Sequence, residues 1–270
     1  MSKRTAIPEG AKAQRVYLTL REDISAGVYA TGQTLPGEQK LASTFDVSRV
    51  TVRRALAALC EAGLIERRAG AGTVVCGQRS DDDRVAMDVN TLMPQLAEMS
   101  RATTARLLSF TYGDAPDKVA EAMGLADRER VQIATRVRLA DGVPFSHLTT
   151  YVPEAIASHY SESDLADTPL FSLLERSGVS IGNARQTVTA TLASPAVAEA
   201  LDVSVGTALL SLQRIVCDSA GQGVEYLDAR YRPDRFSLEM TLARVGDGAH
   251  RHWQPTIAST PEDTRERKRA

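Results

Sequence analysis

Apolar residues recur every three or four positions through the N-terminal part of the chain, which is the spacing of an amphipathic helix. The pattern predicts a helix over residues 12–26, ended by the Gly- and Pro-containing stretch "GVYATGQTLPGE", and a short helix over about 38–44. A third helix over about 49–62 is expected, because Ser48 is a favourable N-cap and Gly63 a favourable C-terminal stop.

The stretch after the third helix, "LIERRAGAGTVV", has two short apolar runs around Gly70 and Gly72, which predicts a β-hairpin. Three helices followed by a hairpin make a winged helix-turn-helix, whose third helix enters the major groove of DNA. The segment "VSRVTVRRAL" places Arg49, Thr51 and Arg53 on the first turns of that helix, where guanidiniums can bind guanine or phosphate. Two simpler interpretations stay open, a solvated helix face and a winged helix that binds protein.

The C-terminal part contains an internal repeat. The stretch "VAEAMGLADRERVQIATRVRLADGVPFSHLTTYVP" starts at Val119, and "VAEALDVSVGTALLSLQRIVCDSAGQGVEYLDARYRP" starts at Val197. Each copy predicts a short helix, a strand with a central arginine, a turn and a returning strand that ends in a tyrosine. The arginines are Arg136 and Arg214, and the tyrosines are Tyr151 and Tyr231.

With further strands near 104–112 and 184–192, the two copies predict one antiparallel sheet with helices packed on it. The expected fold class is therefore α+β, with an N-terminal winged helix-turn-helix and a C-terminal antiparallel sheet with helices. We expect a winged-helix domain over 1–77, a linker over 78–92, a sheet domain over 93–243 and a disordered tail over 244–270.

The distribution of charge supports two domains of different roles. The chain of 270 residues has a net charge of −2, but residues 1–77 carry 11 Lys and Arg against 7 Asp and Glu. The remaining residues carry 21 against 27. A basic N-terminal part joined to an acidic C-terminal part indicates that only one half meets a polyanion.

The number of cysteines and the hydropathy of the chain indicate the cellular compartment of the protein. Cys60, Cys76 and Cys217 are odd in number and widely spaced, which argues against a disulfide framework and for a reducing environment. No apolar run reaches the length of a membrane span, and the N-terminus has no signal-peptide pattern, so we expect a cytoplasmic protein without membrane contact. The "HRH" at 250–252 lies in the predicted tail, and we expect no metal site and no cofactor.

The stretch "LPGEQKLASTFDVSRVTVRRALAALCEAGLIERRAGAGTVV" resembles the GntR family of bacterial transcription regulators and covers most of the predicted winged helix. The resemblance implies a homodimer that binds a palindromic operator in double-stranded DNA and is released from it by a small molecule. It also implies DNA-binding roles for residues of the second helix, the third helix and the wing. These are Lys40, Ser48, Arg49, Thr51, Arg53, Arg68, Gly70 and Gly72.

The chain departs from the family pattern before the second helix. The family usually has Ser-Glu-Arg where this chain has Gly37, Glu38 and Gln39. The loss of the serine removes the preferred N-cap of that helix, although glycine is tolerated there. The loss of the arginine removes a contact typical of the family, which Lys40 would partly replace.

The stretches "RVRLADGVPFSHLTTYVP" and "VEYLDARYRPDRFSLEM" resemble the UTRA domain, which is chorismate lyase-like in fold and marks the HutC-like branch of the same family. This resemblance implies that the sheet domain binds the effector. The effector-binding residues it implies are Arg136, Arg138, His147, Tyr151, Glu225 and Tyr231. A glutamate common in the family is replaced by Leu148, which fits a less hydroxylated effector. Guanidiniums favour carboxylate or phosphate, so we expect a small anionic metabolite.

The functional hypothesis is a ligand-responsive transcription regulator, specifically a repressor and not an enzyme. Two alternatives stay open. One is an enzyme of chorismate lyase-like fold, although no catalytic arrangement of side chains stands out and fold does not carry chemistry. The other is a DNA-binding protein that answers to a protein partner and has no small-molecule effector. As isolated features, strand arginines are often surface charges and strand-end tyrosines are often core residues.

Overall fold

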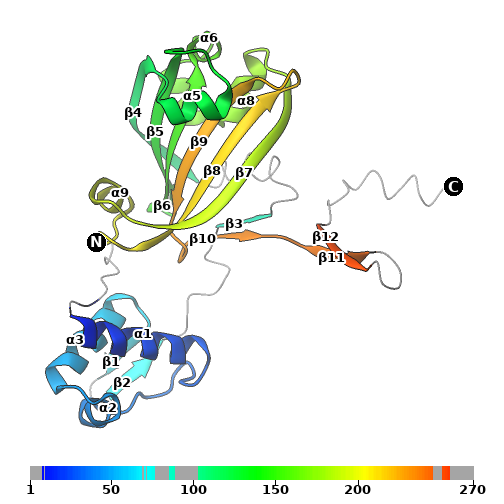
Figure 1. The fold of residues 1–270 in the computed structure, drawn as a ribbon. Helices are drawn as coiled ribbons and strands as arrows, with labels where there is room; N and C mark the ends of the chain where they lie inside the picture. Colours follow the sequence, from blue (N-terminus) through cyan, green and yellow to red (C-terminus); the bar gives the residue numbers. More distant parts are fainter. Residues whose placement is uncertain are drawn as a thin grey trace. The chain divides into compact units, whose positions relative to one another are not determined.

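The computed structural model describes residues 8, 10–68, 70, 72–76, 85–88, 103–245 and 251–255. The chain forms two compact units, one built on the N-terminal helices and one on a large sheet (Figure 1). Cys76 and Cys217 are free thiols, in line with their spacing. Among the described helices, none combines the length and the apolar character that crossing a bilayer would take.

The N-terminal unit begins with three helices, α1 (Ala11–Ser25), α2 (Glu38–Phe45) and α3 (Arg49–Glu61). Each helix buries one apolar stripe, as the spacing predicted. The stripes meet in one cluster that includes Tyr17, Leu20, Leu41, Val52, Leu56 and Leu59. The partly buried Cys60 packs against this cluster. Burial of these side chains is the main force that holds three short helices together, since none is long enough to be stable alone.

The wing is a two-stranded antiparallel hairpin, β1 (Ile65–Arg68) and β2 (Gly72–Val75). Ile65 and Val75 turn inward and join the helical core. Thr34 forms an isolated bridge with Val74, so the segment before α2 also pairs with the wing. The three helices and the hairpin form the winged helix-turn-helix that the sequence predicted.

The second unit is a six-stranded antiparallel sheet in the order β4-β5-β6-β9-β8-β7. Its strands are β4 (Thr104–Asp114), β5 (Arg130–Ala140), β6 (Val143–Pro153), β7 (Ile181–Leu192), β8 (Ala208–Asp218) and β9 (Gly223–Tyr231). Helix α5 (Asp117–Met123) connects β4 to β5, and α9 (Pro195–Leu201) connects β7 to β8. Each half is a strand, a helix and a hairpin, and the halves meet at β6 and β9, so the internal repeat folds as one pseudo-symmetric sheet.

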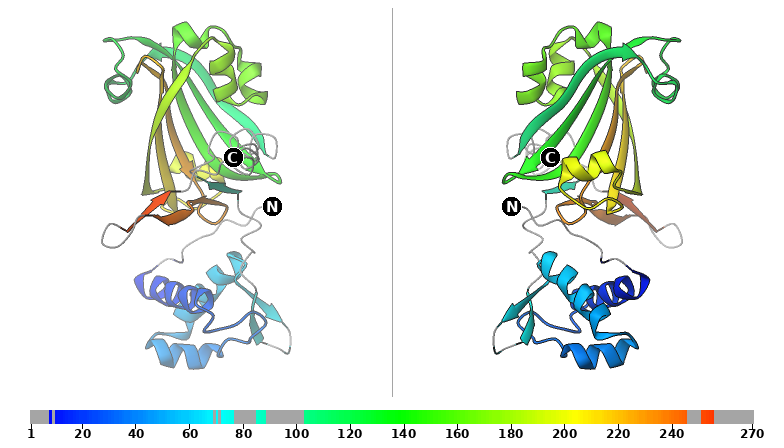
Figure 2. Two further views of the ribbon diagram at one scale, coloured as in Figure 1. Left: turned by 90° about the vertical axis from the view of Figure 1, so that its right-hand side faces the viewer. Right: turned by 90° about the vertical axis from the view of Figure 1, so that its left-hand side faces the viewer.

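Helices pack on both sides of this sheet (Figure 2). One side, which carries Ala134 and Leu148, packs against three short helices and is called the α8 face. These helices are α6 (Glu154–Ala157), α7 (Glu162–Asp167) and α8 (Leu170–Arg176). The other side, which carries Thr149 and Asp228, is called the α5 face, because Tyr226 on it packs against α5. Side chains alternate between these faces along every strand.

Two segments differ from the sequence-based expectation. Strand β3 (Val85–Asp88) lies inside the expected linker and pairs in parallel with β10 (Phe236–Glu239). Strands β11 (Leu242–Val245) and β12 (His252–Pro255) form a hairpin where we expected a disordered tail. Neither segment has a strong alternation of apolar and polar residues, so the pairing partner and not the local pattern decides the structure. Residues 85–88 of the expected linker and residues 252–255 of the expected tail therefore form paired strands.

Candidate functional site

The recognition helix α3 starts at a side-chain cap. The Ser48 hydroxyl accepts a hydrogen bond from the Thr51 backbone N–H at 3.2 Å, and the two hydroxyl oxygens lie 2.8 Å apart. This cap satisfies a backbone donor that the first turn leaves free. Arg49, the first residue of the helix, is exposed beside it. Ser48 and Thr51 thus fix where the helix begins, and Arg49 extends from that fixed end.

One carboxylate joins the recognition helix to the wing. The Arg53 Nε atom lies 2.7 Å from Glu38 Oε2, and an Arg67 terminal nitrogen lies 3.5 Å from Glu38 Oε1. Glu38 is the first residue of α2, and its N-cap Gly37 provides no side-chain cap. Residues from α2, α3 and β1 therefore converge at this point of the surface.

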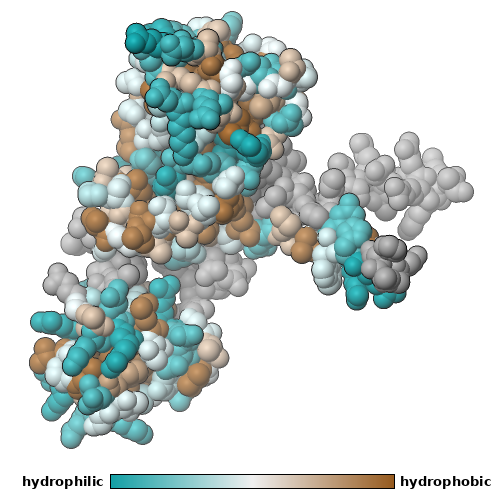
Figure 3. Space-filling view, in the orientation of Figure 1, coloured by the Kyte–Doolittle hydropathy of each residue, from teal (hydrophilic) through white to brown (hydrophobic). Residues whose placement is uncertain are grey.

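The other expected DNA-binding residues lie near the wing and on α2. Arg68 pairs with Glu66 at the end of β1. Gly70 and Gly72 have φ angles of 78° and 81°, a left-handed conformation that glycine adopts at least cost. Lys40 is exposed on α2. The surface of this unit visible in Figure 3 is mostly hydrophilic, with hydrophobic residues scattered among the polar ones.

The α8 face of the large sheet carries a cluster of buried charged residues. Arg136 lies level with Leu148 and Ala229 on the neighbouring strands, and Arg138 lies level with Ser146 and Tyr231. Strand alternation therefore brings the two arginines and Tyr231 to one side of the sheet. Arg214 and Glu225 of the second half face the same side. We call Arg136, Arg138, Arg214, Glu225 and Tyr231 the arginine cluster.

The two arginines of the first half are almost completely buried, with 6% and 7% of their surface exposed. Arg136 donates to the Leu165 carbonyl at 3.5 Å, and Arg138 donates from Nε and a terminal nitrogen to the Thr103 hydroxyl at 3.1 and 2.8 Å. Burial lowers the pKa of Arg136, and burial together with the charge of Arg136 lowers the pKa of Arg138 to about 10. Both side chains stay protonated at neutral pH, so the α8 face holds two close positive charges.

The second half adds a third arginine and one carboxylate. Arg214 donates from Nε and a terminal nitrogen to Gln186 Oε1 at 2.9 and 2.6 Å. Burial raises the pKa of Glu225, while the charges of Arg214 and Arg136 lower it. Burial also raises the pKa of Tyr231, against the charges of the three arginines. With three guanidiniums and one carboxylate, the cluster has an excess of positive charge.

Three polar atoms on this face are buried without a hydrogen-bond partner among the described residues. They are Gln132 Nε2, Arg136 Nε and Ser146 Oγ. The other end of the Gln132 amide accepts a hydrogen bond from the Tyr160 hydroxyl at 3.1 Å. A buried donor without a partner costs about 1–3 kcal/mol, so native proteins rarely keep one unless something else binds it. The α8 face therefore has unused hydrogen-bonding capacity next to its positive charge.

His147 and Tyr151 do not belong to this cluster, contrary to the expectation from the sequence. Both side chains lie on the α5 face, where Tyr151 contacts the Tyr226 ring with centroids 5.9 Å apart. Burial and the charge of Arg230 lower the pKa of His147. Because side chains alternate, a one-residue difference in alignment between the repeats moves Tyr151 to the face opposite Tyr231.

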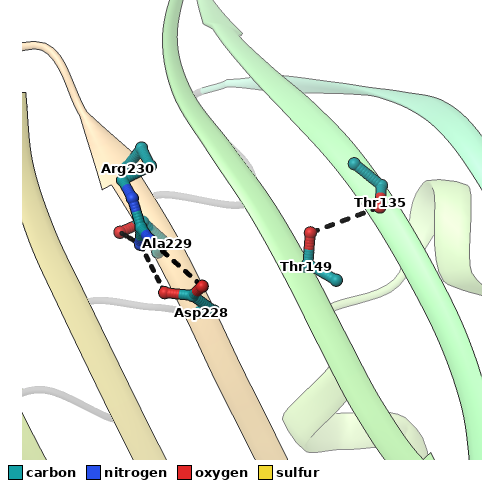
Figure 4. Close-up of polar contacts among 5 residues, drawn as sticks. All are labelled: Thr135, Thr149, Asp228, Ala229 and Arg230. Carbon is teal, nitrogen blue, oxygen red and sulfur yellow. Dashed lines mark hydrogen bonds and ion pairs between the residues drawn. The ribbon is translucent and has the colours of Figure 1, made fainter. Parts of the chain in front are cut away.

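The α5 face has its own polar contacts, which are shown in Figure 4. The Thr135 and Thr149 hydroxyls lie 3.3 Å apart across β5 and β6, and Arg230 forms an ion pair with Asp228 within β9. The close-up shows both pairs turned to the same side of the sheet. In this pair the charge of Arg230 lies beside the opposite charge of Asp228.

Sequence reasoning missed several residues of both sites. Gln132, Ser146 and Tyr160 are uncharged, and no local pattern distinguishes them from ordinary strand or loop residues. Glu38 was noted only as part of a motif. Arg214 was predicted only as the central arginine of the second repeat. The repeat itself was the signal that could have placed it on the same face as Arg136, because the two repeats form a pseudo-symmetric sheet.

Two models of known protein families match successive parts of the chain. Residues 12–75 match the bacterial regulatory proteins of the gntR family, and residues 98–237 match the UTRA domain. The chain is 32% identical over 251 residues to the HTH-type transcriptional regulator Rv0792c of Mycobacterium tuberculosis, covering 91% of this chain and 88% of that protein. It is 26% identical over 227 residues to the HTH-type transcriptional repressor NagR of Bacillus subtilis, covering 84% and 92%.

The fold is also similar to a solved structure. The crystal structure of the possible transcriptional regulator YydK from Bacillus subtilis matches with a TM-score of 0.54 at 18% identity. The match covers 86% of this chain and 99% of the solved chain. At this identity the likeness concerns the fold alone, and it extends over both units.

Proposed function

Because this chain belongs to the GntR family of bacterial regulatory proteins and carries a UTRA domain, we propose that it is a repressor controlled by a small anionic molecule. The family is one of transcription regulators and not of enzymes, and its DNA-binding part is the winged helix-turn-helix. The proposal adds three points to this: repression, the anionic effector and its site on the α8 face. Repression rests on relatives that are named repressors, such as NagR.

The observation that carries the effector proposal is the set of buried polar atoms without partners beside the two arginines. Arg136 Nε and Ser146 Oγ can both donate to an anion, and Arg138 lies level with Ser146. A carboxylate or phosphate would satisfy these donors and offset the positive charge in one step. Leu148, the residue that pairs with Arg136 across the strands, is apolar, so Glu225 is the one carboxylate of the arginine cluster.

The opposite end of the cluster has a different chemistry. The Gln132 amide, oriented by Tyr160, leaves its Nε2 donor unused, and Glu225 lies near Tyr160 and Arg136. These groups suit an uncharged polar end of a molecule. We therefore propose an effector with one anionic end near Arg136 and Arg138 and a polar end near Gln132 and Glu225.

Repression would work through a coupling free energy between two sites. If the effector and the operator stabilise different states of the protein, each weakens the binding of the other. A homodimer would bind a two-fold palindrome, because the symmetry of the protein is reflected in the half-sites.

The first experiment tests DNA reading by α3. Arg49→Ala should cost roughly 1–3 kcal/mol of operator affinity, because this exposed guanidinium extends from the capped start of the recognition helix. Fluorescence anisotropy at fixed salt, on a duplex selected by the wild-type protein from a randomised library, measures the loss. Arg54→Ala removes the same charge about 140° around the helix from Arg49 and should cost less. Equal affinity of wild type and Arg49→Ala would contradict this role.

The second experiment tests the effector. A thermal-shift screen should compare carboxylates and phosphates with their neutral amide or alcohol analogues. A ligand at 100 times its Kd stabilises the folded state by about 2.7 kcal/mol, which raises Tm measurably. We expect stabilisation by anions and not by their neutral analogues. Stabilisation by neutral or cationic compounds alone would refute the anionic effector, and a protein that binds DNA but responds to no metabolite would favour the alternative without one.

A further inference from the structure

Glu38 is the carboxylate that contacts both DNA-facing elements of the winged helix. Its Oε2 atom lies 2.7 Å from Nε of Arg53 on α3, and its Oε1 atom lies 3.5 Å from a terminal nitrogen of Arg67 on β1. The Glu38 side chain is 25% exposed, whereas the two arginines are 57% and 56% exposed. The Glu38 carboxylate is therefore partly buried, while the two guanidiniums extend into solvent.

The geometry of the contact restricts how Arg53 can meet DNA. A guanidinium can bind a base through its two terminal nitrogens or through Nε and one terminal nitrogen. Glu38 occupies Nε, which leaves the two terminal nitrogens of Arg53 for the partner. That pair matches the O6 and N7 acceptors of guanine in the major groove.

The charge of Glu38 also acts on DNA of any sequence. Non-specific binding comes from Lys and Arg that neutralise phosphates, and an unrestrained arginine on an exposed helix would readily do so. A carboxylate next to two arginines offsets part of their charge and repels the phosphate backbone. The carboxylate should weaken phosphate contacts more than a base contact. A base contact benefits from the fixed orientation of the Arg53 guanidinium, and a phosphate contact does not.

We propose that Glu38 is a specificity-determining residue of DNA binding, which holds Arg53 for base reading and suppresses phosphate binding by Arg53 and Arg67. A structural role alone is the competing explanation. Exposed ion pairs contribute little to folding, with a median of about 0–1 kcal/mol, so loss of the pair should leave the winged helix folded. This inference rests on DNA binding by the winged helix and not on the effector.

The test compares Glu38→Gln with wild type in the full-length protein. Glutamine keeps the size of the side chain and a hydrogen-bond acceptor but removes the charge. The probes are a duplex selected by wild type from a randomised library and a scrambled duplex of equal composition. Affinities for both come from fluorescence anisotropy over a series of salt concentrations, and thermal unfolding checks the fold.

We expect Glu38→Gln to bind the scrambled duplex several-fold more tightly, with a salt dependence steeper by about one phosphate contact. The ratio of selected to scrambled affinity should fall by roughly five- to tenfold, the discrimination of a guanidinium that reads a base. A repeated selection with Glu38→Gln should yield a weaker sequence preference.

The matched control is Glu66→Gln, which removes the acid that pairs with Arg68 on the wing. It changes the net charge equally but does not touch α3, so both duplexes should gain affinity by the same factor and the ratio should stay. Glu38→Asp keeps the charge but withdraws the carboxylate by one methylene, so it should lower the ratio without a gain on the scrambled duplex.

Three results would overturn the proposal. The first is an unchanged affinity ratio in Glu38→Gln together with a gain equal to that of Glu66→Gln. The second is a lower melting temperature in Glu38→Gln with an unchanged ratio. The third is an unchanged ratio in Glu38→Asp. A wild-type protein that selects no sequence at all would instead contradict the proposed function.

Discussion

Arg136 and Arg138 are buried at the cost of their hydration, and Arg136 Nε has no hydrogen-bond partner among the described residues. Thr103 and the Leu165 carbonyl accept hydrogen bonds from them, and Glu225 supplies one carboxylate for three nearby arginines. Buried charges that lack full compensation destabilise a protein, and such groups gather at functional sites. A negatively charged ligand would offset the excess positive charge of the arginine cluster. These residues therefore fit ligand binding better than a purely structural role.

His147 gives a prediction about pH at the same scale. Burial and Arg230 lower its pKa in the folded state, although Asp228 opposes them, so the unfolded chain binds a proton more readily than the folded one. The contribution of neutral His147 to the free energy of unfolding should then be complete above the ordinary histidine pKa of about 6.5. It should be lost as the pH falls from there through the pKa of His147 in the folded state. His147→Gln should show a smaller fall in Tm between about pH 7.5 and 5.5. Equal slopes in both proteins would contradict the shift.

Residue by residue, the sequence pointed to most members of the arginine cluster and missed the neutral residues beside it, Gln132, Ser146 and Tyr160. That Arg136 and Arg138 share a face follows from strand alternation within one repeat. Tyr160 could not be found this way, because it follows the short helix α6 and its contact with Gln132 spans 28 residues. Such a contact depends on how the chain crosses the sheet, and local patterns carry no information about it.

At the scale of elements, the repeat explains why the sheet was predictable. Each half supplies a strand, a helix and a hairpin, so one pattern that occurs twice defines six strands. The helices between β6 and β7 were not predicted, because they have only four to seven residues and little periodicity. Strand β3 was missed for a related reason, since its partner β10 is distant in the sequence.

The contact between α5 and β9 gives a prediction at this scale. A Cβ atom on Gly223, at the start of β9, would lie 2.5 Å from the Met123 carbonyl oxygen and 2.7 Å from its Cα. Gly223→Ala should therefore push the end of α5 away from the sheet and destabilise the protein by about 1–3 kcal/mol.

Denaturant unfolding followed by circular dichroism measures this loss. Gly113→Ala in β4 is the control, because a Cβ atom there meets nothing within 4 Å. It should be neutral or slightly stabilising. A Gly223→Ala protein as stable as Gly113→Ala would show that α5 does not pack closely on β9.

For the whole molecule, the two units have separate hydrophobic cores and opposite charge balance, which suits a division of labour. We predict that the sheet domain, residues 93–243, dimerises without the winged helix. The sheet has two edge strands, and β7 is exposed along most of its length with backbone groups available for pairing. Sedimentation velocity at micromolar concentration should give a dimer for this fragment and a monomer for residues 1–77. A monomeric sheet fragment would refute the prediction.

The measurement that tests the account most directly is the release of DNA from wild type and from Arg138→Ala. Fluorescence anisotropy on the selected duplex, at fixed salt, is titrated with the anionic compound found in the thermal-shift screen. Arg138 lies in the buried cluster of the sheet and not in the winged helix. We therefore predict equal DNA affinity of both proteins without the compound, release of wild type by it, and no release of Arg138→Ala at the concentration that releases wild type. Release of the mutant at that concentration would contradict the account.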